Sequence, residues 1–258
     1  MYFQIDQTAV RIASTVHDFP RESPDLPRWL SDAFDWCEDL ILESSPFANP
    51  DAATHFFGDS PLRKLVGFDT WLALCMRWPR FCLSRKMHKM KPWAALSLMP
   101  HLFLRLVPGA EIQLANRAKR ESKPVGQLET IADLARHLES VPAEVFQLRF
   151  QSLLRNLNAE RQNIVDFHDA WYRGDFPYLT SLAQRLPVMN IPEMRQAYLL
   201  ARNQSWLKSI RNATQSKRRS LILVGAVHLF GPGNLVELYQ TEFEAAISPI
   251  PVGVASSH

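Results

Sequence analysis

Residues 220–239, SLILVGAVHLFGPGNLVELY, contain the pattern around which the rest of the chain can be organised. Residues 221–227 form a short apolar run with one glycine, which is typical of a strand buried on both faces of a parallel sheet. A Gly-Pro-Gly turn follows, and Asn234 is a suitable N-cap for a helix that begins LVELY. The stretch therefore predicts a strand, a turn and a helix, with His228 at the carboxyl end of the strand.

The position of His228 allows two interpretations. Ligands and catalytic groups collect at the carboxyl ends of strands in open α/β sheets, which favours a functional imidazole. Gly225, three residues earlier, would leave a side-chain gap through which another group can approach the strand. Alternatively, the imidazole only caps the strand by bonding to a nearby carbonyl group. The stretch alone does not decide between them.

Composition limits the class of protein. The 258 residues are 47% apolar and 21% charged, with a net charge of +3, as in an ordinary soluble globular protein. The basic residues are dispersed among 26 acidic ones, which argues against nucleic acid as a partner. The most hydrophobic window, residues 93–107, is too short and too polar to span a bilayer. No secretory signal opens the sequence, so we expect a cytoplasmic protein unless a leader has been lost.

Cysteine spacing and a basic run give two further expectations. The three cysteines lack metal-ligand spacing, and Cys75 and Cys82 lie seven residues apart on a predicted helix, so we expect buried free thiols, with Cys37 as the third. A basic run is either a solvated helix face or a contact for an anionic substrate or partner; it consists of Arg77, Arg80, Arg85, Lys86, His88, Lys89 and Lys91.

Taken in order, the chain predicts an α/β fold, of the α+β kind, with a central mixed sheet. Two strands occupy residues 2–16, and further short strands are predicted at DLILE, KPVGQLE and residues 243–249. Prolines divide residues 61–107 into several short helices, and more helices follow from residue 130. We expect one domain over residues 1–250, with a helical insertion at about 60–107 and a tail at 251–258. The N- and C-terminal strands should be adjacent, and the helical insertions should cover a cleft at the strand carboxyl ends.

Four of the predicted strands end in a group that can bind a metal ion or move a proton. These groups are His17, Glu43, Glu129 and His228. Parallel strands joined by helices place their carboxyl ends at one edge of the sheet, so the four side chains should lie together. Two imidazoles with carboxylates suit Zn²⁺, Mn²⁺, Fe²⁺ or Co²⁺, and a remaining carboxylate can act as a general base. Each Glu alone has a simpler explanation, because strands must leave the sheet toward solvent.

Several stretches together resemble one family. VGAVHLFGPGNLVELY resembles the C-terminal motif of the TraB/PrgY/GumN family, which extends to the TIKI proteases and, more distantly, to ChaN-like and erythromycin-esterase-like proteins. Similar stretches are LILE at 40–43, GAEIQLANRAKRESKPVGQLET at 109–130, AWYRGD at 170–175 and LLARNQSWLKSI at 199–210. The resemblance covers nearly the whole chain.

The resemblance implies two G-x-x-H motifs, two glutamates and an Arg-Asn pair around one site. Gly225 and His228 match the second motif, and Glu43 and Glu129 match the glutamates. The Arg-Asn pair matches Arg202 and Asn203, although such a pair in a helix is often one solvated residue and one local cap. The first motif departs from the family, because Ser14 replaces its glycine while His17 is kept.

The leading functional hypothesis is a metal-dependent hydrolase, with peptide bonds as the substrate that the resemblance implies. His17, His228, Glu43 and Glu129 are the predicted ligands of a Mn, Co, Zn or Fe ion, and the catalytic set is Glu43, Glu129, Arg202 and Asn203. Ser14, Gly225 and Arg202 are predicted to contact a peptide or small-molecule substrate. The alternative is a non-catalytic protein that sequesters a peptide, a pheromone or a haem-like ligand in the same cleft, which the change at Ser14 favours.

Overall fold

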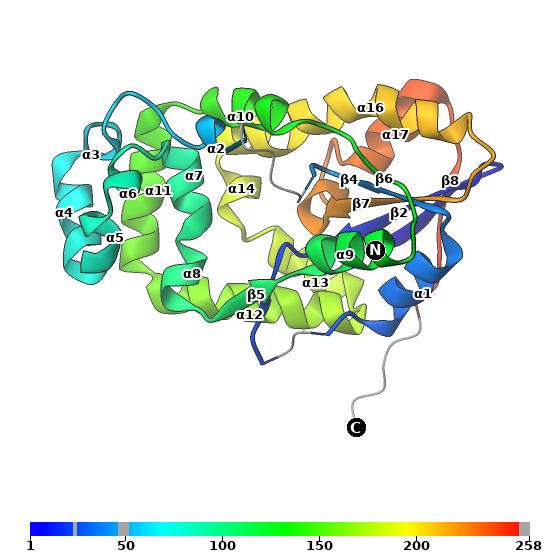
Figure 1. Ribbon diagram of the computed structural model, residues 1–258, viewed down its shortest axis with the longest axis horizontal. Coiled ribbons are helices and arrows are strands. Elements are labelled where there is room, and N and C mark those ends of the chain that lie inside the picture. The colour runs from blue at the N-terminus through cyan, green and yellow to red at the C-terminus, as the bar shows by residue number, and fades with distance from the viewer. Residues whose placement is uncertain (23–24, 46–51, 253–258) are drawn as a thin grey trace.

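A six-stranded mixed sheet combines strands from both ends of the chain (Figure 1). The computed structural model describes residues 1–22, 25–45 and 52–252, so most of the predicted 251–258 tail lies outside the described residues. The strands are β1 (Tyr2–Ile5), β2 (Val10–Thr15), β4 (Asp39–Leu42), β6 (Val125–Gln127), β7 (Ser220–Gly225) and β8 (Ile247–Pro249), in the order β6-β4-β7-β2-β1-β8. The predicted α/β class with a central mixed sheet is confirmed.

The four strands β6, β4, β7 and β2 are parallel neighbours, while β1 and β8 add antiparallel strands on one side. In the register of β2 and β7, Ser14 is opposite Val224 and Thr15 is opposite Gly225. The predicted adjacency of the N- and C-terminal strands is therefore confirmed. All four parallel strands end at the same edge of the sheet, where the functional side chains were expected.

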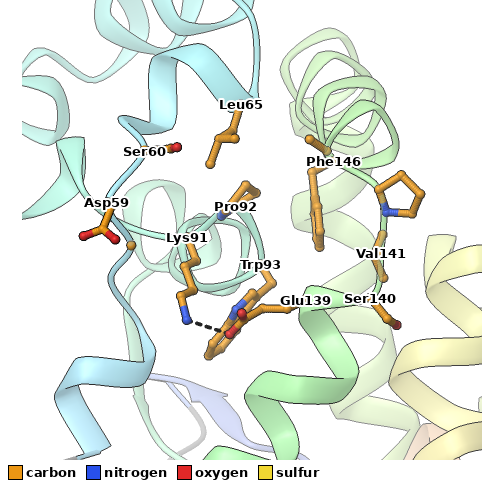
Figure 2. A pocket seen from close by; sticks show the side chains of 13 residues that line it. Asp59, Ser60, Leu65, Lys91, Pro92, Trp93, Glu139, Ser140, Val141 and Phe146 are labelled. Carbon is orange, nitrogen blue, oxygen red and sulfur yellow. Dashed lines mark hydrogen bonds and ion pairs between the residues drawn. The ribbon is translucent and has the colours of Figure 1, made fainter.

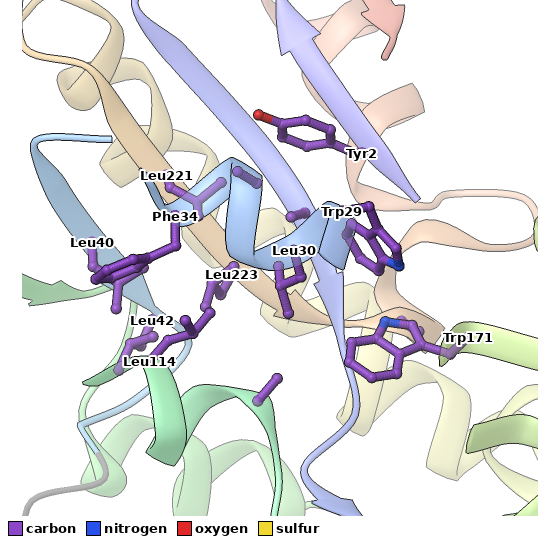
Figure 3. Packing of buried hydrophobic residues seen from close by; sticks show 14 of the residues in the cluster. Tyr2, Trp29, Leu30, Phe34, Leu40, Leu42, Leu114, Trp171, Leu221 and Leu223 are labelled. Carbon is purple, nitrogen blue, oxygen red and sulfur yellow. The ribbon is translucent and has the colours of Figure 1, made fainter. Parts of the chain in front are cut away.

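Helices bury both faces of the sheet. One face packs against α1 (Arg28–Trp36), α9 (Ala110–Arg120), α12 (Leu157–Arg173) and α13 (Phe176–Ala183). Figure 3 shows Leu30 near Leu223 of β7, and Trp29 next to Trp171. The other face packs against α16 (Ala201–Thr214) and α17 (Leu235–Phe243). Strand β7 is buried along its whole length, as its unbroken apolar run predicts.

A second, helical part of the molecule has its own hydrophobic core. Its helices are α2 (Ala52–His55), α3 (Leu62–Leu65), α4 (Phe68–Arg77), α5 (Pro79–Leu83), α6 (Arg85–His88), α7 (Pro92–Leu98), α8 (Pro100–Phe103), α10 (Ile131–Glu139), α11 (Ala143–Arg155), α14 (Pro187–Asn190) and α15 (Pro192–Arg195). Helices α3 to α8 and α11 of this part lie on the left of Figure 1, whereas α10 and α14 lie in the middle of the view, between those helices and the sheet. Strands β3 (Asp18–Pro20) and β5 (Leu106–Pro108) form a small second sheet between the two parts. None of the helices in the described ranges is both long and apolar enough to cross a membrane.

Two local predictions are wrong. Cys75 and Cys82 are joined by a disulfide, because Pro79 ends α4 and turns the chain back, so the two residues do not share one helix face. Cys37 is the buried free thiol that was expected. The strand predicted up to Val227 ends at Gly225, and residues Ala226–Leu229 form a short 3-10 helix, η2. His228 therefore lies in a helical turn after the strand.

Candidate functional site

Side chains that follow three of the four parallel strands meet at one edge of the sheet. Glu43 comes directly after β4, Glu129 two residues after β6, and His228 three residues after β7. Backbone pairing continues past the strands, since the Glu129 N–H donates to the Glu43 carbonyl oxygen at 2.9 Å. All three side chains are buried. The predicted convergence of these positions is present, although they were expected to surround a metal ion.

The guanidinium of Arg202 occupies the centre of this group. Its Nε and Nη2 donate to Oε1 of Glu129 at 2.9 and 2.5 Å, and Nη2 also donates to Oε2 of Glu43 at 2.7 Å. Nη1 donates to Nε2 of His228 at 3.1 Å. One buried cation therefore connects two carboxylates and an imidazole, which are the partners that a buried guanidinium needs.

A wide helical turn holds Arg202 in place. The π-helix η1 (Gln196–Leu200) precedes α16, and Nη1 of Arg202 also donates to the carbonyl of Tyr198 within that turn, at 3.1 Å. The guanidinium lies over the ring of Trp206, with 4.8 Å from Cζ to the ring centroid. Single π-turns inside helices are frequent at functional sites. Here the turn places Arg202 and Asn203 beside the sheet edge.

His228 is held in one tautomer. Its Nδ1 lies 2.6 Å from Oδ1 of Asn203, and its Nε2 faces Arg202, which can only donate. Nδ1 therefore carries the proton and Nε2 accepts. The ring packs on Trp206 at 4.5 Å between centroids, and only 2% of the residue is exposed. Burial lowers the pKa of His228 to about 3, so the ring is neutral near pH 7. Asn203 acts here as the residue that orients the imidazole.

His17 lies at the exposed margin of the same group. Its Nδ1 is 3.0 Å from Oε1 of Glu111, and the Thr15 hydroxyl donates to the same oxygen. The Glu111 carboxylate raises the pKa of the His17 ring above its ordinary value, although solvent at the exposed side of the ring screens part of that attraction. Sequence reasoning missed Glu111 and Thr15. Their pairing depends on how α9 packs, for which the sequence carries no local signal.

Gly109 explains why α9 comes so close to His17. A Cβ at this position would lie 2.2 Å from the Val16 carbonyl oxygen and 2.5 Å from the carbonyl carbon of His17. The Gly109 N–H instead donates to the His17 carbonyl at 2.8 Å. Only glycine permits this backbone approach, which places Glu111, in the first turn of α9, against the imidazole.

Gly225 leaves a gap between His17 and Glu43. A Cβ on Gly225 would lie 3.1 Å from Oε1 of Glu43 and 3.2 Å from Nε2 of His17. Oε1 of Glu43 also accepts from the Gly225 N–H and lies 3.7 Å from Nε2 of His228. The Gly225 gap, defined by His17, Glu43 and Gly225, is therefore bordered by polar atoms that a side chain at position 225 would crowd.

The two glutamates differ in their protonation. Burial alone would raise the pKa of Glu43, but the Arg202 guanidinium, the His17 ring and the Gly225 N–H outweigh it and hold the pKa well below its ordinary value, whereas the neutral His228 ring adds no charge. Burial raises the pKa of Glu129, and Arg202 offsets only part of that effect. The nearby Trp206 indole also lowers the pKa of Glu129, although its N–H forms no hydrogen bond within the described ranges. Oε2 of Glu129 has no hydrogen-bond partner among the described residues. Glu43 is thus the carboxylate held ionised.

The low pKa of Glu43 predicts how stability changes with pH. A carboxyl group whose pKa falls on folding stabilises the protein above its unfolded pKa, here 4.5, and loses that contribution as the pH falls toward about 2. In buffer with a chelator, the free energy of unfolding of the wild type should fall between pH 6 and pH 3 by about 2 kcal/mol more than that of Glu43→Gln. Urea unfolding at both pH values measures this. Equal falls in the two proteins would contradict the assignment.

Ser14 lies apart from the Gly225 gap. It is buried, its hydroxyl oxygen accepts from the Met1 amino group at 2.5 Å, and its carbonyl accepts from the Trp171 indole at 3.0 Å. Its predicted contact with substrate stays a prediction, as do the substrate contacts of Gly225 and Arg202. Among residues 1–22, 25–45 and 52–252, no group of three or more His, Cys, Asp or Glu side chains is arranged to hold a metal ion. Arg202 lies where the two carboxylates would otherwise face each other.

A cavity of about 530 Å³ lies in the helical part of the molecule (Figure 2). Trp93 and Phe146 line it together with Lys91 and Glu139, which form an ion pair at 2.6 Å. Glu139 is the last residue of α10, and the N-cap of that helix, Thr130, directly follows Glu129. Helix α10 therefore runs from the sheet-edge site to this cavity.

The family model of the TraB/PrgY/gumN family matches residues 4–242. The chain belongs to this family, as the sequence motifs indicate. Comparisons with curated proteins and with solved structures give no significant match.

Proposed function

We propose that this member of the TraB/PrgY/gumN family is a metal-dependent hydrolase that acts on peptide bonds, with its reaction centre at the Gly225 gap. The observation that carries the proposal is the convergence at this gap of two imidazoles and an ionised carboxylate, next to a buried arginine. Such groups can activate water and stabilise the negative charge that develops on a carbonyl oxygen.

The donor groups are of the types that a divalent transition metal ion prefers, but in the described structure they are not arranged around one, so binding requires a local rearrangement. His17 and His228 both have Nδ1 hydrogen-bonded, to Glu111 and Asn203 respectively, which leaves Nε2 as the ligand atom. His17, His228 and Glu43 would hold the ion, and Arg202 would have to release Nε2 of His228. Mn²⁺, Co²⁺, Zn²⁺ and Fe²⁺ accept such mixed nitrogen and oxygen ligands, and a bound ion would supply Lewis-acid polarisation of the substrate carbonyl. The ligand role predicted for Glu129 stays a prediction.

The chain's own residues have separate roles in this proposal. Glu43, held ionised, is the carboxylate ligand, while Glu129, whose pKa is raised by burial and whose Oε2 has no hydrogen-bond partner in the described part of the chain, would accept the proton of the attacking water and pass it to the leaving amine. Arg202 keeps Glu43 and Glu129 in position. When the substrate binds, Arg202 would give up one of these carboxylate contacts and donate instead to the substrate carbonyl oxygen, where it stabilises the negative charge that develops. Asn203 orients His228, and Glu111 orients His17.

A non-catalytic ligand-binding protein is the second candidate function. Two observations favour it: each nitrogen of the Arg202 guanidinium already has a partner, and the cavity at Trp93 and Phe146 combines aromatic surface with an ion pair. Ligand pockets are mostly apolar with a few polar groups that orient the ligand. In this case a peptide would bind without being cleaved.

Reconstitution with metal separates the two functions. Protein stripped by a chelator and then supplied with Mn²⁺ or Co²⁺ should bind about one ion per chain and hydrolyse peptides from a mixed pool. His17→Ala and His228→Ala should each weaken metal binding, measured by calorimetry, by at least about 10-fold and lose hydrolysis. His101→Ala is the control, because this ring pairs with Asp18 at 3.4 Å and has no contact with the gap. Peptide binding without metal uptake or cleavage would favour the second function.

A further inference from the structure

The helical surface formed by α3, α4, α5 and α6 carries exposed apolar and basic side chains side by side. These helices lie at the end of the molecule farthest from the sheet (Figure 1). Four of the eight exposed large hydrophobic residues in the described part of the chain lie here, within residues 68–83. The sheet-edge site uses none of them.

Three of the four form a stripe along α4. Phe68, Leu72 and Met76 are 69%, 47% and 74% exposed, and their four-residue spacing places them within an arc of about 80° on the helix. Thr70 and Leu74 face the opposite side of α4, and both are buried, as is Trp71. The fourth residue, Leu83 on α5, is 81% exposed. Helix α4 therefore has two apolar faces, one packed in the helical core and one open to solvent. An exposed apolar face of this kind marks an interaction surface.

The disulfide fixes α5 beside this stripe. It joins Cys75 to Cys82 with their Cα atoms 5.3 Å apart. Met76 and Leu83 directly follow these two cysteines, so the disulfide holds the backbone segments that carry these two exposed residues next to each other.

Strong positive charge surrounds the apolar side chains. Residues 62–91 contain eight lysines and arginines and one acidic residue, Asp69, whereas the whole chain carries only +3. Of the basic run found in the sequence, Lys91 pairs with Glu139 and His88 bonds to the Cys82 carbonyl. Seven basic side chains of this surface are exposed and form no ion pair with another described residue, namely Arg63, Lys64, Arg77, Arg80, Arg85, Lys86 and Lys89.

We propose that the α3–α6 surface binds the headgroup region of an anionic lipid membrane. Unpaired basic side chains complement the negative charge of such a surface, and the apolar stripe can enter the boundary between headgroups and acyl chains. A nucleic acid would use the same charges, but it offers no apolar layer to cover Leu72, Met76 and Leu83. The molecule would then lie on a membrane through its helical end, with the sheet-edge site turned toward solvent.

Co-sedimentation with vesicles tests this surface. The wild type should bind vesicles of mixed phosphatidylglycerol and phosphatidylcholine, and binding should weaken strongly at about 1 M salt, where charges are screened beyond about 3 Å. Each basic residue near an anionic surface contributes about fivefold, so Arg80→Gln, Arg85→Gln and Lys86→Gln combined should weaken binding about 100-fold. Phe68→Ser, Leu72→Ser and Met76→Ser combined should weaken it at least about 10-fold.

Matched controls come from the rest of the chain. Arg120→Gln, Arg185→Gln and Lys217→Gln remove the same charge from exposed positions outside this surface and should leave vesicle binding within about twofold. Circular dichroism melts verify that each variant folds, and the charge variants test the surface independently of the serine variants. Three results would overturn the proposal. The wild type could bind pure phosphatidylcholine vesicles as well as anionic ones, it could fail to bind anionic vesicles, or the control variant could lose as much binding as the variant of this surface. Self-association in solution that the serine variants abolish, without vesicle binding, would show that a second copy covers this face.

Discussion

Arg202→Met is expected to lower the free energy of unfolding by about 3–5 kcal/mol, because it leaves two buried carboxylates without their cation. Glu43 and Glu129 each accept a charged hydrogen bond from this one side chain, and His228 loses the donor to its Nε2. Urea unfolding in buffer with a chelator measures the loss, independently of any bound metal.

Arg136→Ala provides the matched control. Arg136 pairs with Asp133 at 3.0 Å, but 71% of its side chain is exposed, so its loss should cost no more than about 1 kcal/mol. If Arg202→Met cost no more than Arg136→Ala, Arg202 could not be the cation that holds the sheet-edge group together. Lysine at position 202 should recover only part of the loss, since an ammonium group cannot reproduce the forked contacts of the guanidinium.

Gly225→Ala is expected to lower hydrolysis by at least about 100-fold while the protein stays folded. The added methyl group would occupy the Gly225 gap, 3.1 Å from Oε1 of Glu43 and 3.2 Å from Nε2 of His17. The φ angle of −53° at this position is accessible to alanine, so the backbone adds no strain. The crowding should destabilise the fold by about 1–3 kcal/mol.

Gly126→Ala is the control for this substitution. Gly126 also lies in a parallel strand of the sheet, but an added Cβ would lie at ordinary distances from its neighbours, 3.7 Å from the Ile41 side chain and 4.0 Å from the Leu40 carbonyl oxygen. Its hydrolysis should match that of the wild type. Full activity in Gly225→Ala would place the reaction centre elsewhere.

Much of this fold was predictable because its strands are short apolar runs that end at polar residues. The runs before Glu43 and His228 identify buried parallel strands, and parallel strands share one carboxyl edge. The side chains that meet there could therefore be predicted from the sequence. Their exact partners could not, because the partners come from helices whose packing no local pattern specifies.

Arg202 and Glu111 illustrate this limit. The Arg-Asn pair is visible in the sequence, but only the π-turn before α16 shows that Arg202 lies between the glutamates. Glu111 is one of several charged residues in α9, and its contact with His17 depends on the close approach at Gly109. Both contacts join residues more than 70 positions apart.

His228 shows a second kind of limit. The position of His228 at the end of a predicted strand does not indicate that its ring is buried. The 3-10 turn instead places the ring beneath Trp206 and against Asn203. Removing the imidazole leaves buried polar partners unpaired, which costs about 1–3 kcal/mol even without metal.

The most direct test of the proposed reaction centre is hydrolysis of a mixed peptide pool in ¹⁸O-labelled water, followed by mass spectrometry. Wild-type protein reconstituted with Mn²⁺ or Co²⁺ should generate new peptides with ¹⁸O in their new C-terminal carboxyl groups, because water supplies that oxygen. Gly126→Ala should do the same, and Gly225→Ala should not. Peptides that stay bound to the wild-type protein without any labelled product would contradict the account and identify a binding protein.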